Sequence, residues 1–182
     1  MSNRPNICIL AVLLFSMSFG CSVKKYIPED EQLYNGAELE LKSESKIKDI
    51  KNISAELNDL LQPEPNSKIL GIRLGLWAYY KNQEENPGFI NRFLNKKLGE
   101  EPVYFSDVNV PTTEDLILNR LDNRGFFYSS VTSDIDKKEK FASVDYVAEV
   151  STPYTLSEYK VELDSLPIYQ VLRSTLENSL LD

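Results

Sequence analysis

Hydrophobic residues change their spacing several times along the chain, and each spacing predicts a different element. Leu39 and Leu41 alternate with charged residues, which is the period-two pattern of a short half-buried strand. From Ile47 to Leu61 the apolar positions instead recur every three or four residues, as on one face of a helix, and Pro63 ends the pattern. We therefore predict a strand followed by a helix in this part of the chain.

The next segment, from 69 to 98, predicts two further helices. Residues 69–80 fit a strand at alternate positions and a helix at every third or fourth position, and we favour the helix. Residues 89–98 show helical spacing between Pro87-Gly88, which precedes the pattern, and Gly99, which ends it.

The clearest helix signal begins with the sequence TTED at 112–115. It offers an N-cap and acidic residues for the first turn, and Gly125 stands where the helix should stop. Two segments of alternating apolar and polar residues follow, at 126–135 and 141–150, separated by the turn sequence KKEK. They predict a β-hairpin, and the order of strands and helices predicts an α+β fold.

Composition excludes several kinds of site. The 182 residues include no histidine and two cysteines, and the net charge is −8. Without histidine there is no imidazole base for a serine or cysteine nucleophile, and two thiolates cannot complete a four-ligand zinc site. The acidic balance argues against a nucleic-acid partner, because nucleic acids are bound through lysine and arginine. We expect no catalytic residue, no metal and no cofactor.

The first twenty residues have the pattern of an export signal. Arg4 precedes an apolar run from Ile7 to Phe15, and small residues follow up to Gly20. The run has about half of the ~20 residues that a membrane-spanning helix needs. We predict a signal peptide at 1–20 and a flexible tether at 21–36.

The signal ends in the sequence SFGC at 18–21, which resembles a bacterial lipobox. In that motif the cysteine is acylated while the signal is removed. Cys8 lies within the signal, so Cys21 would be the single cysteine of the mature chain and could form no internal disulfide. We predict diacylglycerol and palmitate on Cys21, which together would anchor the chain stably in a membrane. Secretion with a free thiol is the alternative.

Positive charges outnumber negative ones between 68 and 97, in an otherwise acidic chain, and several aromatic residues lie among them. Such a stretch would suit contact with anionic lipid headgroups. The alternative is that its aromatic residues form a core and its lysines are simply solvated. The membrane-facing residues would be Arg73, Trp77, Lys81, Arg92, Lys96 and Lys97.

The predicted helix, the sequence NRLDNRGFFYSSV at 119–131 and the hairpin resemble, in that order, a POTRA domain of outer-membrane assembly proteins. The matching residues are Leu121, Gly125, Phe126 and Phe127, with the exit sequence VDYVAEVSTPYTLSEYKVE at 144–162. Behind the lipobox and KKYIPEDEQLYNGAELELK at 24–42, this order is similar to the N-terminus of the translocation and assembly module lipoproteins (TamL). These are lipid-anchored relatives of the TamA and BamA barrel proteins.

The resemblance implies a β-α-α-β-β POTRA-like domain at 37–152, with a helical insertion around 68–100. Residues 153–182 would begin a second POTRA domain, with a strand at 157–162 and a helix from 165. Because that domain would be incomplete at Asp182, we expect further POTRA domains and a β-barrel beyond it.

The resemblance also implies a non-catalytic function at the outer membrane of a Gram-negative bacterium. A lipid-anchored periplasmic segment would receive unfolded outer-membrane or exported client proteins, with an inner-membrane-anchored protein as a further candidate partner. Clients would add a strand to the sheet edge formed by 126–135. The client-binding residues would be Phe127, Ser129, Val131, Ser133 and Ile135.

Three alternatives stay open at this point. In the first, the edge strand has no client in this particular domain and serves the sheet alone. The chain could also be a lipid-anchored binding protein for glycan or peptide, which would place exposed aromatic residues in a pocket. The third is a lipid-anchored glycosidase with paired carboxylates, although no acid pair is recognisable in the sequence.

Overall fold

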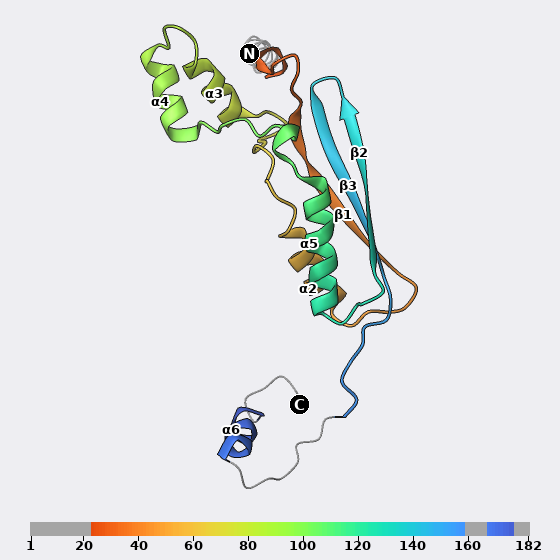
Figure 1. Cartoon of the computed structure of the whole chain (residues 1–182). Helices are drawn as coiled ribbons and strands as arrows, with labels where there is room; N and C mark the ends of the chain where they lie inside the picture. The colour runs from red at the N-terminus through yellow and green to blue at the C-terminus, as the bar shows by residue number, and fades with distance from the viewer. Residues whose placement is uncertain (1–22, 159–166, 177–182) are drawn as a thin grey trace, which may run out of the picture.

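The computed structural model describes residues 23–158 and 167–176, which form an α+β fold (Figure 1). Its strands are β1 (Leu33–Ser43), β2 (Ser130–Lys138) and β3 (Phe141–Val150). Its α-helices are α2 (Ile50–Asn58), α3 (Leu74–Asn82), α4 (Phe89–Leu98), α5 (Val110–Asn123) and α6 (Pro167–Leu176). Two short 3-10 helices, η1 (Lys24–Tyr26) and η2 (Phe105–Asp107), precede β1 and α5.

The last strand of the described residues, β3, lies at the centre of the sheet, which has the order β1-β3-β2. β1 pairs with β3 in parallel, from Leu33 opposite Phe141 to Ser43 opposite Val150, with one irregularity after Tyr34. β2 pairs with β3 in antiparallel orientation and in unbroken register. β1 and β2 are therefore the two edge strands.

One face of the sheet carries the main core. α2 and α5 lie on the same side of the sheet (Figure 1), and their apolar residues pack against alternate residues of β3. In β3 the inward residues are Ala142, Val144, Tyr146, Ala148 and Val150, all buried. All of these except Ala142 belong to one core cluster with Ile53 and Leu57 of α2 and Ile117 and Leu121 of α5. The period-two and helical patterns of the sequence correspond to these two facing layers.

Most predicted elements are confirmed, with shifted boundaries. α4 spans the predicted residues, whereas α3 begins at Leu74 because Leu70 and Gly71 adopt positive φ and residues 69 and 72 pair in a tight turn. α5 begins at Val110, before the predicted TTED signal. The side chain of Asn109 is the N-cap, and its Oδ1 accepts a hydrogen bond from the Thr112 amide at 3.1 Å.

The predicted flexible tether at 21–36 is wrong for residues 23–36. Val23 and Ile27 are buried, and they pack with Leu33 and Leu76 into a second apolar cluster. Trp77, Tyr80, Tyr104 and Phe141 are partly buried against this cluster. The sequence did not predict it, because its apolar residues come from four distant segments and show no local period.

Three predictions concern residues that lie wholly or largely outside the described part of the chain. Cys21 and the signal peptide precede this part, and the predicted strand at 157–162 lies largely in the undescribed segment. The helix predicted from 165 is confirmed in α6, which begins at Pro167.

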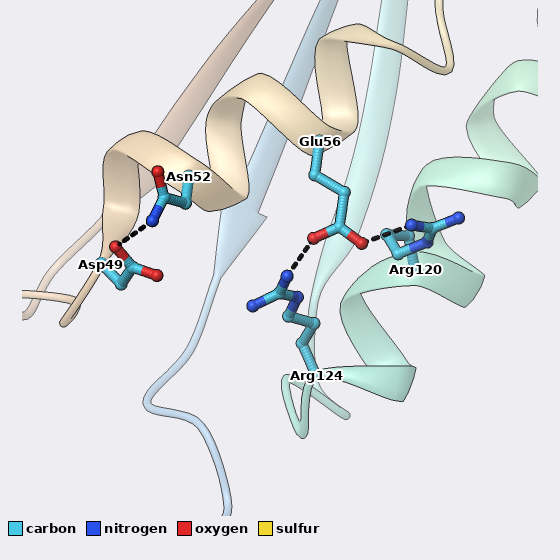
Figure 2. Close-up of polar contacts among 5 residues, drawn as sticks. All are labelled: Asp49, Asn52, Glu56, Arg120 and Arg124. Carbon is cyan, nitrogen blue, oxygen red and sulfur yellow. Dashed lines mark hydrogen bonds and ion pairs between the residues drawn. The ribbon is translucent and has the colours of Figure 1, made fainter.

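Charged residues join α2 to α5 across the outer surface of the main core. The carboxylate of Glu56 accepts hydrogen bonds from Arg120 on α5 and from Arg124, the residue that immediately follows this helix (Figure 2). The hydrogen bond from Arg120 is the largest cause of the lowered pKa of Glu56. At the start of α2, Asn52 Nδ2 donates to Asp49 Oδ1 at 2.7 Å.

We expect Glu56→Gln to lower the melting temperature at neutral pH and to have little effect in acid. A carboxyl with a lowered pKa in the folded state stabilises the fold above its unfolded pKa, and this contribution disappears as the pH falls through the folded pKa. Melting curves at pH 7 and at about pH 3 measure the difference. Glu44→Gln, at an exposed position, is the control. An equal loss at both pH values would contradict the ion pair.

Candidate functional site

The outer edge of β2 is the candidate site, because alternate residues there present unpaired backbone groups. The hairpin turn consists of Glu139 and Lys140, so Lys138 and Phe141 form the closing pair. A two-residue hairpin turn is closed by a hydrogen-bonded pair, and such pairs alternate with non-hydrogen-bonded ones along an antiparallel ladder. The unbroken register then directs the backbone N–H and C=O groups of Val131, Ser133 and Ile135 away from β3.

The two edges of the sheet differ in what lies beside them. At β1, the Tyr34 amide donates to the Val103 carbonyl at 2.8 Å, and the Phe105 amide donates to the Gln32 carbonyl at 2.8 Å. Residues 103–105 thus cover the beginning of the β1 edge. At β2, within residues 23–158, no backbone hydrogen bond joins the strand to a segment outside its hairpin. The β2 edge is therefore uncovered along its whole length, whereas the β1 edge is covered at its beginning.

Val131, Ser133 and Ile135 lie in β2, as the sequence predicted, and their side chains face the helical side of the sheet. Val131 packs against the main core, whereas Ile135 is 41% exposed. These three residues combine outward-facing backbone with partly apolar side chains. An added strand would lie beside these backbone groups and these side chains.

Phe127 and Ser129 are not on the edge strand, so this part of the prediction is wrong. The chain must reverse after α5, and β2 begins only at Ser130. Phe127 lies in the corner with its ring centroid 5.7 Å from that of Tyr154, and Ser129 Oγ donates to the Phe126 carbonyl at 2.8 Å. Both residues therefore shape the corner between α5 and β2.

The face of the sheet opposite α2 and α5 is acidic. Glu38 of β1 lies opposite Asp145 of β3, which lies opposite Asp134 of β2, so three carboxylates form a row across the sheet. The same face carries Glu40, Glu149 and Asp136, with Lys42 and Lys138 as the cations. Like charges on adjacent strands destabilise a sheet. On the edge strand β2, the charged side chains of this face also disfavour pairing with a strand that is acidic or entirely apolar there.

A shallow hollow of about 780 Å³ lies where β1 and β3 end and β2 begins. The residues that line it are mostly of polar types and include Ser45, Tyr128, Glu149 and Thr152. Among the described residues, no cluster of three or more His, Cys, Asp or Glu side chains could hold a metal ion. In the same residues, no helix combines the length and the apolar character needed to cross a bilayer.

Two of the predicted membrane-facing residues point into the protein, which corrects that prediction. Arg73 is only 6% exposed, its Nη2 donates to Asn35 Oδ1 at 2.8 Å, and its guanidinium lies 5.2 Å from the Phe141 ring centroid. Burial lowers the pKa of Arg73. Trp77 packs against the second cluster. The reason is that α3 is the inner helix of its pair.

The other four predicted membrane-facing residues are more accessible. Lys81 is half-buried and pairs with Glu84 Oε1 at 2.7 Å. Arg92, Lys96 and Lys97 are exposed on α4, where Arg92 Nε donates to the Pro87 carbonyl at 3.0 Å. The predicted basic surface is therefore confined to α4 and its neighbourhood.

Comparisons with protein-family models, with curated proteins and with solved structures find no match.

Proposed function

We propose that this chain is the lipid-anchored, periplasmic POTRA-type segment of an outer-membrane protein translocation or assembly factor. The observation that carries the proposal is the free β2 edge in a sheet of order β1-β3-β2. The element order supports it: β1, α2, α5, β2 and β3 follow the β-α-α-β-β order, with α3 and α4 as an insertion.

The proposed activity is strand addition. An extended client segment would lie along β2 and exchange hydrogen bonds with the outward backbone groups of Val131, Ser133 and Ile135. Each such bond contributes roughly 0.5–1.5 kcal/mol net, so several are needed for useful affinity. Binding through the main chain would accept clients of varied sequence, as an assembly factor requires.

The two faces of β2 favour one kind of client strand. Side chains of the added strand on the helical side would lie near Val131 and Ile135, which favours apolar residues. Side chains on the other face would lie near Asp134 and Asp136, which favours lysine, arginine or neutral polar residues. We therefore propose amphipathic, alternating strands as clients, in keeping with segments that later form a sheet.

The anchor would hold this edge close to the membrane. Cys21 lies outside the described residues, but it precedes Val23 by two positions, and Val23 is buried in the second cluster. A lipid on Cys21 would therefore be joined to the folded domain without a long spacer. This arrangement would fix the distance between the bilayer and the sheet.

Amide hydrogen exchange of residues 21–182 tests the edge directly. Without client, we expect the amides of Val131, Ser133 and Ile135 to exchange about tenfold or more faster than those of Thr132 and Asp134. A soluble peptide of alternating valine and lysine should slow the three outward amides and leave the other two unchanged. Protection of both sets, or of neither, would contradict strand addition at β2.

Ser133→Pro supplies the matching variant. It removes one outward N–H without removing a bond to β3, so the domain should stay folded while peptide affinity falls about tenfold or more. Ser133→Ala keeps the N–H and should bind as the original chain does. Thr132→Pro removes an inward N–H and should unfold the sheet, which checks the assigned register.

A further inference from the structure

The α3–α4 pair forms a lobe at the end of the sheet where the chain enters. Figure 1 shows the lobe beside the start of β1, while the chain leaves β3 at the opposite end. Leu76 of α3 is buried in the second cluster with Val23 and Ile27. α4 packs close to α3 at Gly75, where a Cβ atom would lie 2.6 Å from the Leu98 carbonyl oxygen. The lobe is thus fixed to the residues that follow Cys21.

α4 has large apolar side chains on the surface that faces away from α3. Phe89 is 82% exposed, Ile90 69% and Phe93 53%, and the helix has no buried residue. The half-buried residues of α4 are Asn91, Leu94 and Asn95, which places them on the side of the helix toward α3. At about 100° per residue, Phe89, Ile90 and Phe93 fall within one arc of the helix.

Three cations border or interrupt the same arc. Arg92, Lys96 and Lys97 are exposed, and the helix sequence FINRFLNKKL contains no acidic residue. The rest of the chain is acidic overall, since the net charge is −8. An amphipathic helix with exposed aromatic residues, flanking cations and no acid has the composition of helices that lie in a membrane interface.

We propose that α4 lies on an anionic lipid surface, with Phe89, Ile90 and Phe93 between the headgroups and Arg92, Lys96 and Lys97 at the lipid phosphates. Anionic lipid supplies both groups that this helix needs, phosphates for the cations and an apolar layer for Phe89, Ile90 and Phe93, whereas the acidic surface of a second copy would attract the cations alone. The position of the lobe also favours contact with lipid. Two residues span at most about 7 Å, so Val23, which packs with Leu76 of the lobe, lies close to Cys21. The placement at the membrane rests on the proposed lipid anchor, whereas the surface chemistry of α4 does not.

This contact would give the domain a defined orientation. An anchor at one residue permits rotation about the lipid, whereas a second contact through α4 restricts it. Because the chain leaves β3 at the opposite end of the sheet, later domains would extend away from the membrane surface (Figure 1).

Vesicle flotation of residues 21–182 carrying Cys21→Ser tests α4 without any acyl chain. We expect binding to vesicles of equal parts phosphatidylglycerol and phosphatidylcholine, weaker binding at high salt, and none to phosphatidylcholine alone. Phe89→Ser with Phe93→Ser, and separately Lys96→Glu with Lys97→Glu, should each reduce binding about tenfold or more. Circular dichroism confirms that each variant is folded.

Matched controls change exposed residues elsewhere. Leu156→Ser, and Lys48→Glu with Lys51→Glu on the α2 side, should bind as the parent does. Equal losses in these controls, or undiminished binding of the α4 variants, would overturn the inference. Dimerisation without vesicles that is lost on Phe89→Ser with Phe93→Ser would assign the surface to a second copy instead. Ser133→Pro should leave vesicle binding unchanged, so failure here is distinguishable from failure of the β2 edge.

Discussion

Ile117→Ala is expected to lower the free energy of unfolding by about 2–5 kcal/mol. Ile117 is fully buried at the centre of α5, in the core cluster that also contains Leu57, Val144 and Tyr146. Truncation removes apolar contacts and leaves a cavity between the helix and the sheet. Because the sheet has three strands and helices on one face, few other contacts compensate.

Leu116→Ala is the matched control for this variant. Leu116 precedes Ile117 on the same helix and is 46% exposed, so its truncation should cost less than about 1 kcal/mol. Urea unfolding followed by circular dichroism gives both values. Equal losses at the two positions would show that α5 does not dock through Ile117.

Gly125→Ala is the second variant with a large expected effect. Gly125 has φ +86°, and a residue with a side chain in such a conformation loses about 1–3 kcal/mol. An added Cβ would also lie 2.6 Å from the Tyr154 carbonyl oxygen, so the corner would have to open. We therefore expect a cost of about 3 kcal/mol or more in urea unfolding.

The same glycine fixes the chain exit. The Tyr154 amide donates to the Gly125 carbonyl at 2.8 Å, and the ring of Tyr154 contacts those of Phe127 and Tyr128. A hydrogen bond with Tyr128 raises the pKa of Tyr154. Gly88→Ala is the control, because no atom would lie within 4 Å of its Cβ and its φ is −60°. A Gly125→Ala chain as stable as Gly88→Ala would contradict the described corner.

Local sequence patterns predicted the parts of the fold that depend on neighbours in sequence. The hairpin was predictable because Val144, Tyr146 and Ala148 alternate with polar residues and face a single core. α4 was predictable because Gly88 and Gly99 bracket its apolar spacing. The edge position of β2 was expected only from the resemblance, because periodicity does not specify which strand is central.

The parts that sequence patterns missed depend on distant residues. Nothing near Val23 or Ile27 indicates that Leu76 and Phe141 will cover them, so the segment had the composition of a spacer. Arg73 was expected at the surface because of its charge, but Asn35 and the Phe141 ring accommodate its guanidinium. The difference between the two sheet edges could not be predicted either, because residues 103–105 lie beside β1 only in the folded chain.

The parallel pairing of β1 with β3 also has a consequence for chain synthesis and for the proposed export. Leu33 and its partner Phe141 lie about a hundred residues apart, and such distant pairing slows folding because a long loop must first be closed. The central strand β3 is made after the other two strands of this sheet, so a chain emerging N-terminus first has no template on which β1 can pair until residues 141–150 follow. Under the export proposed above, the domain would therefore stay extended enough to pass through a membrane until nearly all of it has crossed.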